Sequence, residues 1–151
     1  MPEPGASAEL VIDTSVAVKF FVEEPDSDRA ARLLERLPRG AVGLVALDFL
    51  FMEFVNVLWR KSSQGDLTAA EAQKAIEKLL ALSSMMEIVP AITLLPETYS
   101  ACRKYAHAAY DAALLVLAEG RGAPFVTADE KFYHKVHRHS RSVVLLRDLE
   151  V

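Results

Sequence analysis

The stretch Tyr110–Phe132, YDAALLVLAEGRGAPFVTADEKF, indicates the fold of this chain most directly. Its first part, about Tyr110–Arg121, has the length and apolar content of a helix that packs on a core. Gly122-Ala-Pro124 separates this helix from the short apolar run Phe125–Thr127, which predicts a buried strand. A further helix is expected at about Asp129–His137. A helix, a short strand and a second helix in succession are typical of a parallel α/β sheet.

The same alternation continues through the rest of the chain. Four other apolar segments predict strands, at Glu9–Asp13, Gly43–Ala46, Glu87–Val89 and Val143–Leu146. Helices are expected between them, at about Thr14–Val22, Asp28–Leu37, Asp48–Ser63 and Leu95–Tyr105. Another helix runs to about Ser84 after Thr68 and Glu71, which have the spacing of a capping box. We therefore expect an α/β fold with a central, mostly parallel sheet of four to five short strands, covered on both faces.

The composition limits the class of protein. The chain has 151 residues, and 52% of them are hydrophobic, which is enough for the core of one domain. A net charge of −4 argues against a generally basic surface that coats DNA, although a local basic patch is compatible with it. A single cysteine, Cys102, excludes an internal disulfide and fits a cytoplasmic location. No apolar run reaches membrane-spanning length, so no membrane partner is expected.

The first residues, MPEPGASAE, lack the basic and apolar regions of a signal peptide. We expect residues 1–8 to form a disordered lead-in and residues 9–151 to form a single domain.

Four carboxylates lie at the ends of apolar segments or inside them, and they carry the chemical prediction. They are Asp13, Glu53, Asp111 and Asp129. A bare carboxylate among buried apolar neighbours is unfavourable unless a cation neutralises it. A shared divalent metal would account for all four, because Mg²⁺ and Mn²⁺ are held by carboxylate oxygens and water. In parallel sheets ligands bind at the carboxyl ends of strands, where Asp13 and Asp129 are expected.

Each acid also has a purely structural interpretation. Asp13 and Asp129 both precede helices and could act as N-caps. Asp111 opens a helix, where the macrodipole favours negative charge. Glu53 is expected in the middle of its helix, where no cap is needed, and the structural alternative for it is an ion pair with Arg60.

The helix that carries Glu53 is unusual in composition. From Phe49 to Trp59 it is apolar nearly all round, which predicts a deeply buried helix. The polar exceptions are Glu53, Asn56 and Arg60, and spacings of three and four place them on one stripe. A buried stripe with an acid and an amide needs a polar partner, which favours a site.

A basic segment follows the last acid. Residues 131–142, KFYHKVHRHSRS, include Lys131, Lys135 and Arg138, with aromatic residues between them. A basic patch with aromatics beside an acidic site is typical of surfaces that hold single-stranded nucleic acid. The histidines of this segment resemble a cluster of ligands. The alternative is that they belong to an ordinary positively charged surface exposed to solvent.

Taken together, these motifs resemble PIN-domain ribonucleases, specifically the VapC-type toxins of bacterial and archaeal toxin–antitoxin pairs. The opening VIDTSVAVKFF is similar to the first strand and helix of that family, with Asp13 and Ser15 in their usual places. FMEFVNVLWRK resembles the helix that carries the family glutamate, here Glu53. The stretch from Asp111 to Asp129 resembles the most specific part of the family.

This resemblance implies a PIN-like three-layer α/β/α fold and a Mg²⁺-dependent endoribonuclease, with Mn²⁺ as a substitute ion. It implies that Asp13, Glu53, Asp111 and Asp129 are both the catalytic residues and the metal ligands, directly or through water. Ser15, Asn56 and Thr127 are candidates for orienting these carboxylates, and Lys131, Lys135 and Arg138 for holding RNA. A cognate antitoxin, an RNA substrate and a homodimer are the implied partners, with the Phe49–Trp59 helix contributing to the dimer core.

Other classes of protein remain as alternatives. A PIN-like protein that is not a toxin would bind or process RNA with the same fold. A phosphoacceptor receiver module also binds Mg²⁺ with strand-end aspartates, but it has adjacent acids after the first strand and a lysine near the last. Here Asp13 has no acidic neighbour and Arg147 stands near the end. A metal-dependent phosphatase needs a second aspartate where this chain has Ser15.

Overall fold

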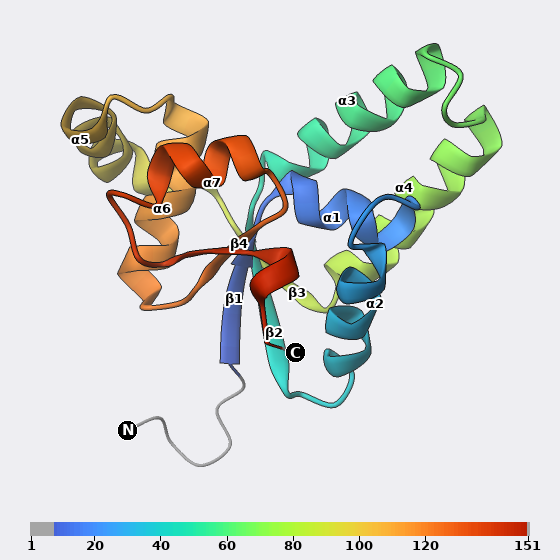
Figure 1. The fold of residues 1–151 in the computed structure, drawn as a ribbon, viewed down its shortest axis with the longest axis horizontal. Coiled ribbons are helices and arrows are strands. Elements are labelled where there is room, and N and C mark those ends of the chain that lie inside the picture. Colours follow the sequence, from blue (N-terminus) through green and yellow to red (C-terminus); the bar gives the residue numbers. More distant parts are fainter. Residues whose placement is uncertain (1–7, 151) are drawn as a thin grey trace.

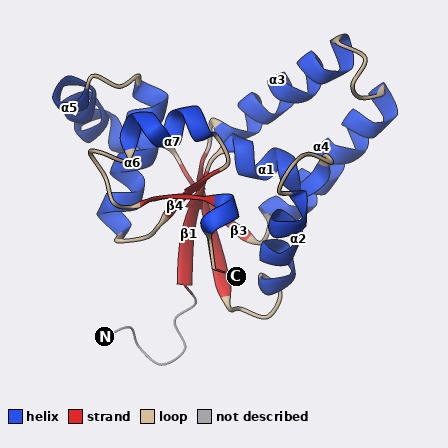
Figure 2. Cartoon of the chain, in the orientation of Figure 1, coloured by secondary structure: helices blue, strands red, loops and turns tan. Residues whose placement is uncertain are grey.

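The central sheet has five strands, and the computed structural model describes it within residues 8–150. The lead-in expected for residues 1–8 lies, apart from Ala8, outside the described residues. The strands are ordered β3–β2–β1–β4–β5, and every neighbouring pair is parallel (Figures 1 and 2). Their bounds are β1 Ala8–Ile12, β2 Val42–Leu47, β3 Met86–Val89, β4 Phe125–Thr127 and β5 Val143–Leu145. The prediction of a mostly parallel sheet of four to five short strands is confirmed.

Seven α-helices connect the strands within the described residues. They are α1 Thr14–Phe21, α2 Ser27–Arg36, α3 Leu50–Ser63, α4 Ala69–Ser83, α5 Leu95–Tyr105, α6 Ala109–Arg121 and α7 Glu130–Val136. Two short 3-10 helices, η1 Ala91–Leu94 and η2 Leu146–Asp148, were not expected from the sequence. The predicted capping box is present before α4, where Thr68 and Glu71 exchange hydrogen bonds.

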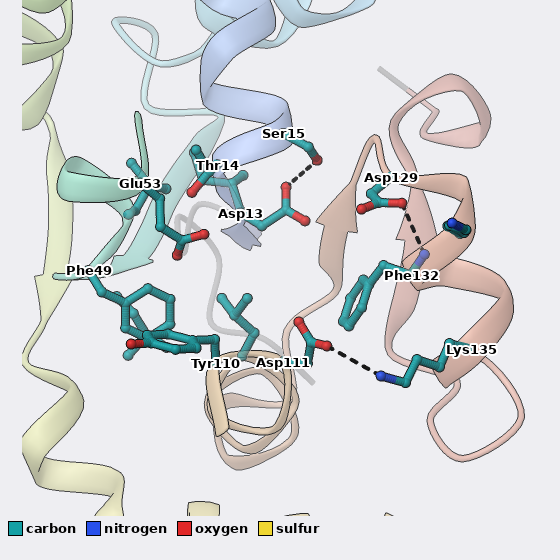
Figure 3. A pocket seen from close by; sticks show the side chains of 15 residues that line it. Asp13, Thr14, Ser15, Phe49, Glu53, Tyr110, Asp111, Asp129, Phe132 and Lys135 are labelled. Carbon is teal, nitrogen blue, oxygen red and sulfur yellow. Dashed lines mark hydrogen bonds and ion pairs between the residues drawn. The ribbon is translucent and has the colours of Figure 1, made fainter. Parts of the chain in front are cut away.

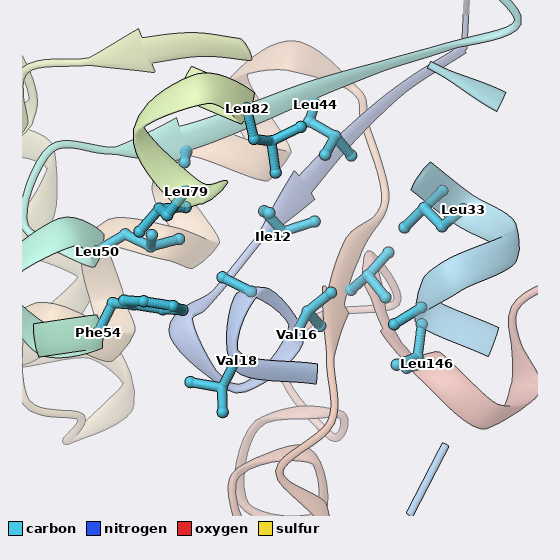
Figure 4. Packing of buried hydrophobic residues seen from close by; sticks show 14 of the residues in the cluster. Ile12, Val16, Val18, Leu33, Leu44, Leu50, Phe54, Leu79, Leu82 and Leu146 are labelled. Atoms are coloured by element: carbon cyan, nitrogen blue, oxygen red, sulfur yellow. The ribbon is translucent and has the colours of Figure 1, made fainter. Parts of the chain in front are cut away.

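Helices cover both faces of the sheet, so the fold has three layers. Side chains alternate along a strand, and in β1 Leu10 and Ile12 face one core while Val11 faces the other. The first core lies under α1 to α4 (Figure 4). The second lies under α6 and α7, and α5 packs against α6 (Figure 1). No helix among residues 8–150 is long and apolar enough to cross a membrane.

The sequence predicted that helix α3 is deeply buried. Within a single copy of the chain this prediction is wrong. Only one stripe of α3 is buried, formed by Leu50, Phe54 and Leu58. On the opposite side Met52 is 76% exposed and Trp59 is 65% exposed. The reason is architectural: α3 and α4 extend together away from the sheet, so α3 packs on neighbours along one side only (Figure 1).

Candidate functional site

The four predicted acids face one cleft at the carboxyl edge of the sheet. Asp13 follows β1 and caps α1, and Asp129 follows β4 and caps α7. Asp111 lies in the first turn of α6 and Glu53 in the first turn of α3. All four line a cleft of about 350 Å³, and their carboxylates point into it (Figure 3). Residues far apart in sequence meet here because parallel strands deliver the start of each following helix to the same edge.

The placement of Glu53 corrects one expectation. It does not lie in the middle of its helix, because α3 begins at Leu50 rather than at Asp48. Glu53 is also exposed toward the cleft rather than part of the buried stripe of α3. Among the described residues no ion pair joins Glu53 to Arg60, so the structural alternative proposed for Glu53 is not observed.

Asp13 is the centre of a hydrogen-bond network that joins the β1–α1 and β4–α7 connections. Its Oδ1 accepts from the Ser15 hydroxyl at 2.5 Å and from the Val16 N–H at 3.2 Å. Its Oδ2 accepts from the Thr127 hydroxyl at 2.5 Å. The same hydroxyl oxygens then accept from the backbone of the second connection, Ser15 from Ala128 N–H at 2.8 Å and Thr127 from Asp129 N–H at 3.2 Å. Ser15 and Thr127 therefore fix the orientation of Asp13.

No cation neutralises Asp13 within the described residues. Burial raises the pKa of Asp13 from 3.8 to about 6, and the nearby charge of Asp129 adds to this rise. The hydrogen bonds from Ser15, Thr127 and Val16 act in the opposite direction, because they favour the charged form. Ionisation of Asp13 remains unfavourable although three hydrogen-bond donors favour its charged form. A nearby cation would therefore stabilise the ionised carboxylate.

Asp129 acts as the N-cap of α7 and also lines the cleft. Its Oδ1 accepts from the Phe132 N–H at 3.0 Å, which confirms the predicted N-cap. The cap occupies only this oxygen, since no hydrogen bond to Oδ2 is found among the described residues. The cap therefore leaves an oxygen of Asp129 for a ligand in the cleft.

The other two acids are also unfavourably charged. Burial raises the pKa of Glu53, and the charges of Asp13 and Asp111 add to it. Burial likewise raises the pKa of Asp111, although Lys135 opposes this. Lys135 Nζ lies 3.8 Å from Asp111 Oδ2, so α7 supplies a partial counter-charge that the sequence did not predict (Figure 3).

Not every predicted site residue reaches the cleft. Lys131 and Lys135 line it from α7. Arg138 lies beyond the end of α7, in an exposed turn, because the helix stops at Val136. Asn56 is exposed on α3 and is not part of the cleft lining.

Three aromatic residues also line the cleft, and of these Phe49 and Tyr110 were not predicted there from the sequence. Phe49 and Tyr110 meet edge to face, with ring centroids 5.1 Å apart, and Phe132 lies across from them (Figure 3). Tyr110 is 62% exposed. The position of Tyr110 next to Asp111 could have indicated an aromatic residue at the site. The sequence does not show, however, in which direction a side chain at a helix start points.

The acids suit a hard divalent cation by donor chemistry. They offer only carboxylate oxygens, and the pKa values of Asp13, Glu53 and Asp111 are raised by burial and, to a smaller extent, by neighbouring acids. As the side chains stand, no three His, Cys, Asp or Glu residues among those described are arranged to hold one metal ion. The fit to a metal therefore rests on the chemistry and charge of the donors.

The fold and the cleft define an α/β protein with an acidic ligand site at the carboxyl edge of its sheet. A family model for the PIN domain matches residues 10–137, and the chain belongs to the PIN domain family. Over 126 residues it is 29% identical to Ribonuclease VapC3 of Pyrobaculum aerophilum, an alignment that covers 83% of this chain and 93% of that protein.

Two solved structures have a similar fold. The crystal structure of PAE2754 from Pyrobaculum aerophilum has a TM-score of 0.66 at 19% identity, covering 95% of this chain and 93% of that chain. A toxin–antitoxin complex from Klebsiella pneumoniae has a TM-score of 0.62 at 16% identity, covering 95% and 100% of the two chains. At these identities the likeness concerns the fold.

Proposed function

We propose that this protein is a Mg²⁺-dependent endoribonuclease and the toxin of a type II toxin–antitoxin pair. The observation that carries the proposal is the convergence of four carboxylates on one cleft, with little positive charge to neutralise them. Membership of the PIN domain family and the likeness to a protein named Ribonuclease VapC3 support ribonuclease chemistry. The likeness to a toxin–antitoxin complex supports an antitoxin partner.

The metal would be held by carboxylate oxygens of Asp13, Glu53, Asp111 and Asp129, directly or through water. When bound, Mg²⁺, or Mn²⁺ in its place, would polarise the scissile phosphate and lower the pKa of the attacking water. Ser15 and Thr127 hold Asp13 in one orientation through their hydroxyl groups, so they are positioning residues. We leave Asn56 out of this set because it does not line the cleft.

The walls of the cleft suit a single-stranded RNA. Lys131 and Lys135 present positive charge toward a phosphate backbone from α7. Tyr110 and Phe49 offer an aromatic face at the rim, where an unpaired base can stack. Arg138 is not among the residues that line the cleft, so we leave it out of this contact.

We infer that a second copy of the chain covers the exposed side of α3. Met52, Val55 and Trp59 form an apolar stripe there, at spacings of three and four residues. The stripe explains why the sequence of this helix is apolar nearly all round although only one side of it is buried within the chain.

The proposal is tested with purified protein freed of any antitoxin and a mixture of cellular RNAs. Cleavage is expected with Mg²⁺ or Mn²⁺, with 5′-phosphate ends on the products, and it should stop in excess chelator. Asp129→Asn keeps a capping oxygen and removes a charge, so it should stay folded and lose cleavage. Undiminished cleavage in chelator would refute the metal site. Cleavage without growth arrest on expression would favour the non-toxin alternative.

A further inference from the structure

A second cleft adjoins the acidic one on the side of α1. Its volume is about 340 Å³, and it shares Ser15, Glu53 and Asp129 with the first cleft. Its remaining wall includes Lys19 and Glu24. The two clefts therefore adjoin at these shared residues, with Lys131 and Lys135 lining the first cleft and Lys19 lining the second.

Lys19 lines the second cleft, and Glu24 pairs it with a further lysine, Lys61, which is not part of the cleft lining. Lys19 Nζ lies 3.1 Å from Glu24 Oε2, and Lys61 Nζ lies 2.6 Å from Glu24 Oε1. Burial acts to raise the pKa of Glu24, but the hydrogen bonds from Lys61 and Lys19 outweigh it and the pKa is lowered. Glu24 is therefore ionised at neutral pH, and the three side chains carry a net charge of about +1.

We infer that Lys19, Glu24 and Lys61 form a second RNA contact, which holds the strand on the side of the acids opposite to Lys131 and Lys135. The inference rests on the proposed ribonuclease function and names where the substrate runs. Carboxylates repel a phosphate backbone wherever no metal neutralises them, so cationic groups on the flanks of the acidic cleft would add binding energy. Cationic groups on both flanks would hold a strand across the acids from one cleft to the other.

The arrangement of the cluster suits this task. Lys19 is only 12% exposed and Glu24 only 22% exposed, so their positions are fixed before RNA arrives. One carboxylate can balance one lysine, and the second lysine leaves an excess positive charge beside an open cleft. A cluster that served only to pin α1 to α3 would not need that excess.

The two interpretations predict different changes in RNA affinity for the variant Glu24→Gln. If the cluster is only a structural ion pair, Glu24→Gln should destabilise the fold and leave RNA affinity unchanged or lower. If the cluster binds RNA, Glu24→Gln raises its net charge by one and should tighten RNA binding. Lys61→Gln lowers the net charge by one and should weaken binding, with a salt slope smaller by about 0.7 for each lost phosphate contact.

The experiment measures fluorescence anisotropy of a labelled single-stranded RNA of about 12 nucleotides. The variants are placed on an Asp129→Asn background with Mg²⁺ present, which leaves the RNA uncut. Glu77→Gln and Lys74→Gln are the controls, because they make the same charge changes on exposed positions of α4. Melting curves identify any variant that fails to fold. If Glu24→Gln fails to fold, the binding of Lys61→Gln decides the test.

Tighter binding by Glu24→Gln and weaker binding by Lys61→Gln, each relative to its control, would support the second contact. If both variants bind as their controls do while the unmodified protein cuts RNA, the second contact is wrong and the ribonuclease proposal stands. If the unmodified protein cuts no RNA under any metal, the proposed function fails regardless of how these variants bind.

Discussion

Replacing Asp13 with asparagine should make the stability of the metal-free protein less dependent on pH. The pKa of Asp13 is raised from 3.8 to about 6 in the folded state, mainly by burial. At about 1.4 kcal/mol per pKa unit, this rise corresponds to about 3 kcal/mol. An asparagine side chain does not titrate, so the variant lacks this contribution entirely.

The sign follows from proton binding. Between pH 3.8 and about 6 the unfolded chain has released the Asp13 proton while the folded chain still holds it. The folded state therefore binds more protons, and its free energy of unfolding falls as the pH rises through this range. This decrease in the free energy of unfolding is complete above the pKa of Asp13 in the folded state. About 2 kcal/mol of the decrease occurs between about pH 4.5 and about pH 7.5.

Urea unfolding in chelator at these two pH values measures the effect. The free energy of unfolding of Asp13→Asn, minus that of the unmodified protein, should increase by about 2 kcal/mol from the lower pH to the higher. Hydrogen bonds lost from Ser15 or Thr127 shift this difference by a constant and cancel between the two pH values. Asp66→Asn, at an exposed turn position, is the control and should show no such change. An unchanged difference for Asp13→Asn would refute the argument that Asp13 is unfavourably charged in the fold.

Three further variants test the other parts of the site. Glu53→Gln should weaken Mg²⁺ binding in titration calorimetry whereas Glu77→Gln should not, and equal affinities would remove Glu53 from the metal site. Changing Lys131 and Lys135 to Ala should raise the Michaelis constant for RNA and flatten its salt dependence, with turnover at saturation little changed; a collapse of turnover alone would place them in the chemistry instead. Trp59→Glu should convert a dimer to a monomer in light scattering, and an unchanged mass would mean that the exposed side of α3 is not the dimer contact.

The sequence predicted the layers of the fold because its signals were local. Short apolar runs indicated the strands, and Gly122 ended α6 in the left-handed conformation with φ at 60°. The four acids could be found because each follows a strand or opens a helix, and parallel topology brings such positions to one edge. The cluster of Lys19, Glu24 and Lys61 could not be found in this way, since its two lysines lie in different motifs and only the tertiary fold brings both to Glu24.

The errors also have physical causes. An apolar sequence predicts a buried helix, but α3 buries only one side because it extends beyond the sheet, and sequence composition does not distinguish a core from an interface between chains. RNA binding by Arg138 stays a prediction: α7 ends two residues before it, and Arg138 does not line the cleft. Side-chain direction beyond a helix end depends on tertiary packing.

Capping and ligand binding are compatible roles for these acids. All four lie at the N-termini of helices, where the macrodipole and free N–H groups favour negative charge. Asp129 uses one oxygen for its cap, and the hydroxyls of Ser15 and Thr127 add donors that favour the charged form of Asp13 despite its burial. Helix starts thus reduce the unfavourable free energy of placing four carboxylates around one cleft. Burial, with a smaller contribution from neighbouring acids, still raises the pKa values of Asp13, Glu53 and Asp111, and a divalent ion would relieve this unfavourable charge. The position at a helix start makes each acid look like a cap in the sequence. The same position helps the site to hold four negative charges.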